Sequence, residues 1–356
     1  FYSLLLLKTV KANEPFVFNV TEIEILENGN QINGYKGGTA TSEDGSTITA
    51  KSFFYNKLTN ILEAIGNVKY VDVSNNVIIK TDKAIYFKNN EKVYTIENSK
   101  AFNENNTITA SNLEYDKINN IFKAKEDAVV KDFEKDTTIY ADEITYFKNE
   151  EKVFAEGKTK ALIEKKYIFN SENVTYLRNT QKLFSQKKSS VKDDNGNFYK
   201  LDNFFYDIDK ELLKGEKIEV LAKVDKDKTD KYFFSEGFFN FKDKSHVAKE
   251  TKINTHKEIF DDKDNDPRLY GSSSYSNEKK TVVENGIFTS CKLNDSCPPW
   301  SIKADTITHD KIKQDMIYKN AIIKVYDVPV LYFPKFFHPD PSVKRRSGFL
   351  QPQFNN

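Results

Sequence analysis

The side chains whose chemistry is easiest to foresee in this sequence are its two cysteines, Cys291 and Cys297. Five residues separate them, and Pro298, Pro299 and Trp300 follow directly. A structural zinc site needs about four ligands, and no histidine or further cysteine lies at ligand spacing, so we expect no metal. Two thiols can instead form disulfides in an oxidising compartment. Either the pair closes a local loop, or each thiol bonds a cysteine elsewhere in a longer protein.

The sequence contains none of the common catalytic motifs. It has no Gly-x-Ser-x-Gly elbow, no phosphate-binding loop and no His-Glu-x-x-His segment. Four scattered histidines are present, namely His246, His256, His309 and His338. Carboxylates are so plentiful that no pair stands out as a glycosidase site. We therefore expect no catalytic residue, no cofactor and no metal, and a chain that is not an enzyme.

A recurring tyrosine indicates which elements would position a site. It stands five residues after a small or apolar position, as in Ala50–Tyr55, Thr81–Tyr86, Ala110–Tyr115, Ala141–Tyr146, Ser171–Tyr176 and Leu201–Tyr206. Weaker copies are Phe234–Phe239, Tyr270–Tyr275 and Ala304–His309. The interval is roughly 30 residues, which is typical of a repeat protein. Each repeat can bury its apolar face only against its neighbours, so we expect an elongated stack.

One repeat, at residues 108–116, predicts the shape of the strands. Apolar residues alternate at Ile108 and Ala110, skip one position, and resume at Leu113 and Tyr115. This is the period of a strand with one phase slip, which predicts a β-bulge and a bent strand. Turn-forming residues and a second strand follow. No window keeps the helical pattern for long, so we predict an all-β fold with almost no helix.

The charge balance bears on the class of partner. Lysine and arginine number 54 against 53 aspartates and glutamates, for a formal net charge of +1. A nucleic-acid-binding protein would show a basic face. We therefore expect no nucleic-acid partner.

The first twelve residues suggest export. The apolar run at residues 1–7 is too short to span a membrane. Val10 and Ala12 occupy the small-residue positions of a signal-peptidase site. We interpret residues 1–12 as a truncated signal peptide, cleaved after Ala12; the other interpretation is a first strand of the fold.

The most specific stretch lies near the C-terminal end. The cysteine loop precedes Trp300, the segment 328–334 reads Val-Pro-Val-Leu-Tyr-Phe-Pro, and 345–352 reads Arg-Arg-Ser-Gly-Phe-Leu-Gln-Pro. These motifs closely resemble the lipopolysaccharide-assembly family of the Gram-negative outer membrane, called LptD or OstA. The repeats look like the OstA-type domain of that family. The two resemblances together cover nearly the whole chain after Ala12.

The resemblance implies an architecture and a role. The fold would be an elongated β-jellyroll of repeated bent antiparallel strands, with an open apolar interior, over residues 13–335. A proline-rich linker (336–347) and the start of a first barrel strand (348–356) would follow. The chain would be the periplasmic part of the lipopolysaccharide transporter, at the periplasmic face of the cell outer membrane. It would receive lipopolysaccharide from an LptA-type jellyroll bridge and pass lipid A to a barrel, which an LptE-type lipoprotein would plug.

This interpretation predicts roles for particular residues. Acyl chains would lie against inward-facing residues of the bent strands, namely Ile108, Leu113, Tyr115, Ile139, Ile144 and Tyr146; the other interpretation is that these residues only fill a closed core. An exposed edge strand would accept a partner strand through Phe16, Phe18, Ile23 and Ile25. The resemblance further implies that Cys291 and Cys297 tie this domain to the barrel. Pro352 would weaken the first barrel strand and act as a lateral gate.

Three other functions compete with this interpretation. An exported β-helical polysaccharide lyase or hydrolase would also be repetitive, but it needs catalytic carboxylates or basic residues clustered on one face. A soluble periplasmic jellyroll bridge protein and a surface adhesin share the repeat. The length of the array and the Ser-Gly-Phe-Leu tail argue against the last two.

Overall fold

Strands make up most of the protein. The structure, a computed structural model, describes residues 15–103, 105–222, 229–255, 266–292, 298–340 and 343. Over these residues it contains strands β1 to β24 and three short 3-10 turns, η1 (Glu27–Gly29), η2 (Lys88–Asn90) and η3 (Lys148–Glu150). This confirms the predicted all-β fold with almost no helix. Within the same ranges, no helix has the length and apolarity that crossing a membrane requires.

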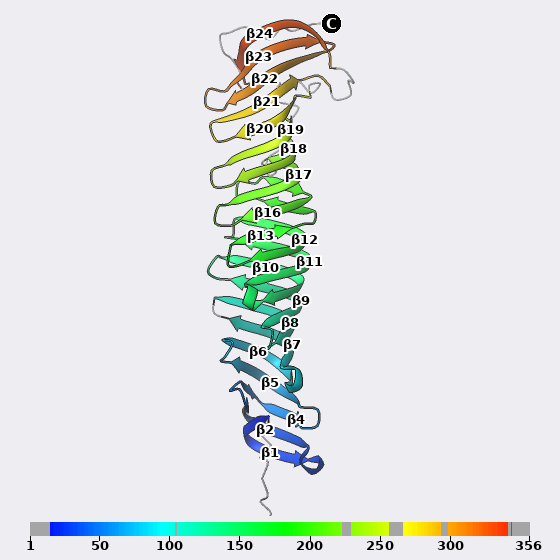
Figure 1. Cartoon of the computed structure of the whole chain (residues 1–356), viewed down its shortest axis with the longest axis vertical. Coiled ribbons are helices and arrows are strands. Elements are labelled where there is room, and N and C mark those ends of the chain that lie inside the picture. The colour runs from blue at the N-terminus through cyan, green and yellow to red at the C-terminus, as the bar shows by residue number, and fades with distance from the viewer. Residues whose placement is uncertain are drawn as a thin grey trace, which may run out of the picture. The chain divides into compact units, whose positions relative to one another are not determined.

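The chain divides into two compact units. Unit 1 runs to Glu156 and unit 2 begins at Gly157. Unit 1 contains β1 (Phe16–Leu26), β2 (Gln31–Ser42), β3 (Thr47–Ala50), β4 (Ser52–Asn56), β5 (Ile61–Asp72), β6 (Val77–Phe87), β7 (Lys92–Asn103), β8 (Asn106–Asp116), β9 (Ile121–Asp132) and β10 (Thr137–Phe147). β11 (Lys152–Ile163) crosses the boundary. From β5 to β10 each strand pairs antiparallel with the next one in sequence, and they stack in chain order (Figure 1).

The long strands of unit 1 are bent, as their phase slip predicts. Register shifts interrupt the ladders between Ile65 and Val68, Lys80 and Lys83, Ile96 and Ser99, Thr109 and Asn112, and Ala141 and Glu143. At several bends the backbone is left-handed, with φ of 63° at Glu97 and 47° at Asn98. The extra residue of a bulge turns the strand and raises its twist. The predicted β-bulges are therefore confirmed.

Each bend divides its strand into two halves, and the stacked halves form the two arms of a V in unit 1. Arm A holds the strand halves that end in the turns at residues 57–60, 88–91, 117–120 and 148–151. Arm B holds the halves that end in the turns at residues 43–46, 73–76 and 133–136. Aromatic rings fill the space between the arms: Tyr70 of arm B lies 6.0 Å from Tyr86 and 6.2 Å from Tyr115 of arm A. Such ring pairs contribute about 0.5–1.5 kcal/mol each beyond the burial of their surface.

Unit 2 repeats the pattern with shorter strands at its start. It contains β12 (Tyr167–Leu177), β13 (Lys182–Ser185), β14 (Ser189–Lys192), β15 (Phe198–Leu201), β16 (Asn203–Asp207), β17 (Leu212–Ala222), β18 (Asp230–Asn240), β19 (Ser245–Asn254), β20 (Arg268–Ser276), β21 (Lys280–Thr289), β22 (Trp300–Asp310), β23 (Asp315–Val325) and β24 (Val328–Pro339). From β17 onward, consecutive strands pair antiparallel. A buried cluster that includes Val283, Ile307 and Tyr318 forms the core of its last strands.

The last strand of unit 2 contains prolines. Among the described strands β24 pairs only with β23, and it carries Pro329 and Pro334. Proline lacks the N–H that a central strand needs, so an edge is where it is tolerated. β24 extends to Pro339, which makes residues 336–339 strand where we expected the start of a linker. The other predicted boundaries, including the signal peptide at 1–12 and the barrel strand at 348–356, lie outside the described residues or stay predictions.

Candidate functional site

The recurring tyrosine joins the interior of each repeat to a turn. In the repeats of Tyr55, Tyr86, Tyr115, Tyr146 and Tyr176 the ring is buried and the hydroxyl donates to a side chain five residues later, in the turn that follows the strand. Tyr206 is an exception among the described repeats, because Glu211 accepts from Tyr167 instead and the buried Tyr206 hydroxyl has no hydrogen-bond partner. Examples are Tyr55 to Asn60 Oδ1 at 2.9 Å, Tyr115 to Asn120 Oδ1 at 3.3 Å, Tyr146 to Glu151 Oε1 at 3.3 Å and Tyr176 to Gln181 Oε1 at 3.2 Å. A buried hydroxyl needs such a partner, because an unpaired one costs about 1–3 kcal/mol.

The residue two positions after each tyrosine links neighbouring turns of arm A. In unit 1 this residue is a lysine, and its backbone N–H donates to a carbonyl of the preceding turn. The bonds are Lys57 to Asn30 O at 2.8 Å, and Lys88 to Asn60 O, Lys117 to Glu91 O and Lys148 to Asn120 O at 3.0 Å each. The tips of arm A are thereby joined in a row. Our sequence reasoning missed these lysines, although the recurring Tyr-x-Lys was the signal that could have found them.

The six residues predicted to contact lipid form three rows across β8, β9 and β10. The rows are Ile108–Val130–Ile139 in arm B, and Leu113–Ala124–Ile144 and Tyr115–Phe122–Tyr146 in arm A. The ring of Phe122 lies 4.5 Å from that of Tyr115 and 6.1 Å from that of Tyr146. All six predicted side chains are at most 2% exposed. The structure therefore brings the six residues together in one interior. The β9 residue in the middle of each row belongs to the same interior and was not predicted; these residues are Val130, Ala124 and Phe122.

This burial bears on the two interpretations of the interior. With side chains that are almost inaccessible, the rows fill the space between the arms, as a core would. An acyl chain could reach them only if the arms separated. Lipid binding by these residues therefore stays a prediction.

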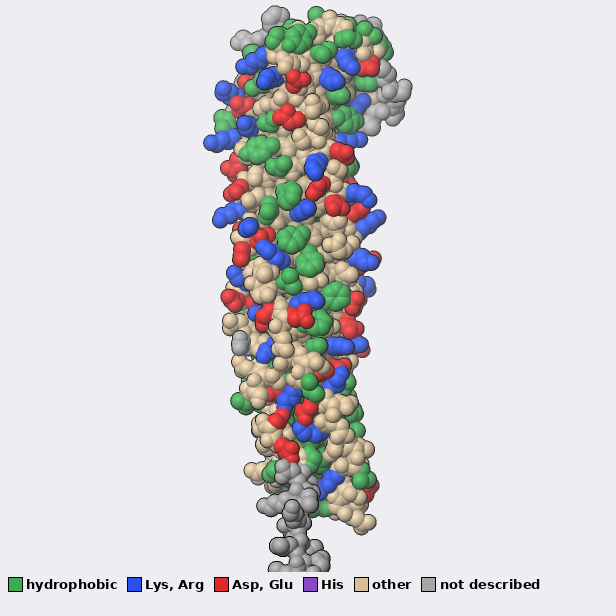
Figure 2. Space-filling view, viewed as in Figure 1, with side chains coloured by type: hydrophobic (Ala, Val, Ile, Leu, Met, Phe, Trp, Pro, Cys, Tyr) green, Lys and Arg blue, Asp and Glu red, His purple; other side chains and the backbone are tan. Residues whose placement is uncertain are grey.

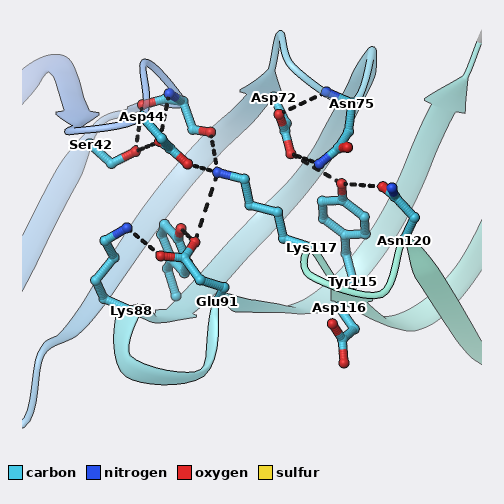
Figure 3. A network of polar contacts seen from close by, with 12 residues as sticks. Ser42, Asp44, Asp72, Asn75, Lys88, Glu91, Tyr115, Asp116, Lys117 and Asn120 are labelled. Carbon is cyan, nitrogen blue, oxygen red and sulfur yellow. Dashed lines mark hydrogen bonds and ion pairs between the residues drawn. The ribbon is translucent and has the colours of Figure 1, made fainter.

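Polar contacts cross the mouth of the V, where the tips of the two arms meet (Figure 3). The hydroxyl of Tyr115, in arm A, donates to Asp72 Oδ2 of arm B at 3.1 Å. Lys117 Nζ donates to Ser46 Oγ of arm B at 2.9 Å and forms an ion pair with Asp44. Burial, together with the Asp72 carboxylate, raises the pKa of Tyr115 well above its ordinary value. Tyr115 therefore remains a protonated donor.

The predicted partner edge divides into an anchored half and an exposed half. Among the described strands β1 pairs only with β2, so its other backbone edge is unpaired. Phe16 is buried, with its ring 5.2 Å from that of Tyr55, and Phe18 is half-buried. Ile23 and Ile25 are 54% and 62% exposed. Capture of a partner strand there stays a prediction.

The predicted disulfide and gate are only partly described. Cys291 is half-buried, and its Sγ lies 3.6 Å from the carbonyl oxygen of Trp300. Cys297 and Pro352 lie outside the described residues, so the roles of both stay predictions. No group of three or more His, Cys, Asp or Glu side chains that could hold a metal occurs within the ranges that the structure describes.

A polysaccharide lyase or hydrolase would need a basic or acidic cluster on the charged surface. On the face drawn in Figure 2, lysines and arginines are interspersed with acidic side chains. A hollow at the bends of unit 2 contains Lys200 and Lys217 among its lining residues. Lys200 pairs with Glu219 at 3.3 Å and Lys217 with Asp202 at 2.8 Å. Lys158 and Lys188 also line the hollow, together with the acidic Glu172. Because lysines and carboxylates are mixed there, the hollow is not the cluster of one charge that the enzymatic alternative needs.

Comparison with known proteins finds similarity to an OstA-like family and to proteins named for lipopolysaccharide assembly. Residues 17–172 match the family model described as OstA-like protein. The LPS-assembly protein LptD of Yersinia enterocolitica is 40% identical over 85 residues, which cover 24% of this chain and 10% of that protein. LptD of Sodalis glossinidius is 44% identical over 72 residues, or 20% and 9% of the two chains. LptD of Pseudomonas fluorescens is 30% identical over 91 residues, or 25% and 9%.

Each of these matches covers only a part of this chain and of the relative. The matched segments span about a tenth of the length of the curated relatives. Among solved structures, similarity is found to LptH of Pseudomonas aeruginosa, described as the LptA-homologous periplasmic component of the lipopolysaccharide transport device. The sequence identity is 17% and the TM-score 0.29, with 32% of this chain and 83% of that chain covered.

Proposed function

We propose that this chain, which carries an OstA-like domain and is related to the LPS-assembly proteins named LptD, is the periplasmic part of an outer-membrane lipopolysaccharide transporter. In this role it receives lipopolysaccharide from an LptA-type jellyroll bridge at the free edge of β1. It passes lipid A to a membrane barrel for insertion in the outer leaflet. An LptE-type lipoprotein would bind that barrel. The proposed role is transport and involves no catalysis.

The observation that carries the proposal is the set of apolar rows on the inner face of β8, β9 and β10. Both arms contribute, and the same alternation of buried side chains recurs from β5 to β10. Once the arms separate, the series of rows would offer acyl chains a continuous apolar surface. Transfer of one methylene from water to such a surface contributes about 0.8 kcal/mol. Lipid that replaces contacts between the arms would therefore be stabilised along its length.

Photo-crosslinking with lipopolysaccharide tests the proposal on the intact protein. A photoreactive residue in place of Leu113 or Ile144, on the inner face, should capture the lipid. The matched controls are Glu114 and Thr145, their immediate neighbours, which alternate to the outer face of the same strands. Equal labelling from both faces, or labelling from the outer face alone, would overturn the proposed path.

A further inference from the structure

Two lysines of arm A reach across the mouth of unit 1. Lys117 contacts Asp44 and Ser46 in the turn between β2 and β3, and Lys117 and Ser46 are 71 residues apart in sequence. Lys148 Nζ donates to the carbonyl oxygen of Asn75, in the turn between β5 and β6, from a distance of 73 residues in sequence. Together with the bond from Tyr115 to Asp72, these contacts join the tips of the two arms.

Burial of the Lys117 ammonium costs free energy unless nearby groups compensate its charge. Its side chain is only 10% exposed, whereas lysine is almost never so buried without a partner. Figure 3 shows its ammonium between two carboxylates, Asp44 of arm B and Glu91 of arm A, the latter 3.8 Å away. A charge that is removed from water in this way depends on these partners. The ion pair is therefore a specific link between the arms.

Separation of the arms would not require the strand ladders to break. The ladders are already interrupted at the bends, where Glu97 and Asn98 of β7 have left-handed backbones. A small rotation at these bends would widen the mouth while each half-strand kept its partners. What must break is the set of side-chain contacts between the arms. These are the aromatic contacts in the interior and the polar contacts at the mouth.

We propose that Lys117 and Lys148 are latches that close the mouth of unit 1, and that a phosphorylated acyl lipid releases them. The inference rests on the proposed function. Phosphate oxygens can replace the Asp44 carboxylate and the Asn75 carbonyl as partners of the two ammonium groups, since lysine binds phosphate as a point charge. The acyl chains then occupy the apolar rows as the arms part. One lipid thus supplies both the new anionic partner and the apolar filling.

A matched control exists at the same position of the repeat. Lys88 also follows its tyrosine by two residues, but its ammonium pairs with Glu91 three residues later, on its own arm. Unit 2 varies at this position: Ile208 and Phe241 are buried there, whereas Lys311, two residues after His309, donates to Ser276 Oγ at 3.0 Å and to the carbonyl oxygen of Asn277 at 2.6 Å. A change at Lys88 therefore alters the charge at the mouth without breaking a link between the arms.

Distance measurement in the lipid-free protein tests the latch by itself. Spin labels carried by unnatural amino acids would replace Val73 of the arm B tip and Ile118 of the arm A tip, which are 75% and 68% exposed. The unsubstituted background should give one narrow distance. The variant K117M/K148M should show an additional population with a longer and more broadly distributed distance between the labels, whereas K88M should not. An unchanged distance in K117M/K148M would overturn the latch, whatever the lipid does.

Lipid uptake tests the release. The rate of labelling from a photoreactive residue at Leu113 would be measured with bisphosphorylated lipid A and with its dephosphorylated form. The protein with both lysines should label about five to ten times faster with the phosphorylated probe, and K117M/K148M should label with both probes at similar, fast rates. D44N weakens the latch but keeps the lysine, so it should label faster than the unsubstituted protein and retain the preference for phosphate. If K117M/K148M and K88M preferred the phosphorylated probe to the same degree, the release mechanism would be overturned.

The two measurements separate the latch from the proposed function. If the spin-label distance widens in K117M/K148M but neither lipid labels Leu113 in any variant, the latch exists and the proposed lipid path is wrong. Circular dichroism and thermal melting would show that each variant is folded. If K117M/K148M does not fold, D44N alone decides the distance test, because a widened distance is expected there as well.

Discussion

A single tyrosine side chain links the core of each arm A repeat to the surface. The ring of Tyr115 stacks on Phe122, while its hydroxyl reaches both Asn120 in its own turn and Asp72 in arm B. Phenylalanine would supply the same apolar surface but would remove the one O–H proton that faces these two oxygens, and Asp72 would keep only its bonds from Asn75. The recurrence of tyrosine at this position follows from having to satisfy the core and the turn with one residue.

Replacement of Tyr115 by phenylalanine should measure the polar part of that role. We expect the free energy of unfolding of unit 1 to fall by about 1–2 kcal/mol, because the buried Asp72 Oδ2 loses the bond from Tyr115 and keeps only the one from Asn75 Nδ2, while the ring contacts remain. Urea unfolding followed by a probe in unit 1 would measure it. The control is Y140F, since Tyr140 is 40% exposed on the outer face of β10. Equal, negligible effects of the two changes would contradict this account.

His246 in unit 2 predicts a dependence of stability on pH. Burial beside Phe234 and Phe239, with a smaller contribution from the Lys311 ammonium, lowers the pKa of His246 to about 4. The unfolded chain takes up this proton near pH 6.5, whereas the folded chain resists it. Stability is therefore complete above about pH 6.5 and falls as the pH drops toward 4. The loss is at most about 3 kcal/mol, and partial solvent exposure of the ring reduces it.

The variant H246F should remove this dependence. Unfolding of the unsubstituted protein and of H246F would be compared at pH 7 and pH 4.5, with the same probe in unit 2. We expect H246F to lose less stability on acidification by about 1–2 kcal/mol. An identical loss in both proteins would show that other groups control the acid response.

The bends and turns set how closely neighbouring strands approach each other. In β2, Gly38 has φ of +157°, and a β-carbon there would lie 2.3 Å from the carbonyl oxygen of Asn19 in β1. Gly45, in the turn after β2, also has a positive φ of +83° but has open space around it. Gly38 is therefore needed both for its backbone conformation and for the close approach of β1, whereas Gly45 is needed for its backbone conformation alone.

The variant G38A should detach the edge strand. We expect a loss of about 2–4 kcal/mol in the pairing of β1 with β2, because the methyl group collides with the β1 backbone and the conformation is strained. G45A should cost about 1 kcal/mol, from backbone strain alone. Hydrogen exchange of the β1 amides would report the difference as lost protection. Similar protection of β1 in both variants would exclude the close approach as the cause.

At the scale of the whole molecule, the cysteines predict how this chain is tied to the rest of a longer protein. We expect Cys291 and Cys297 to pair with cysteines of the barrel, as the resemblance implies, because a disulfide within a loop of about seven residues gives the smaller entropic gain. Non-reducing peptide mapping of the intact protein would identify the partners. A dominant peptide that joins Cys291 to Cys297 would reject the link between domains.

Local sequence patterns were sufficient to predict the strands and their bends. Alternation of apolar residues and its phase slip are local features, so the bent strand at 108–116 and its inner face could be read from a single repeat. The same is true of the recurring tyrosine, whose turn partner lies only five residues away. Local patterns suffice here because the ladder joins each strand to its neighbour in sequence.

The contacts between the two arms could not be predicted from the sequence and became apparent in the folded protein. Lys117 and Ser46 meet although 71 residues separate them, and no periodicity distinguishes Lys117, which crosses the mouth, from Lys88, which does not. The difference depends on how the twist accumulated over several strands brings one tip opposite another. The closed packing around Tyr115 likewise follows from the distance between the arms. Sequence patterns specify the faces of the strands, but the distance between those faces is a property of the assembled fold.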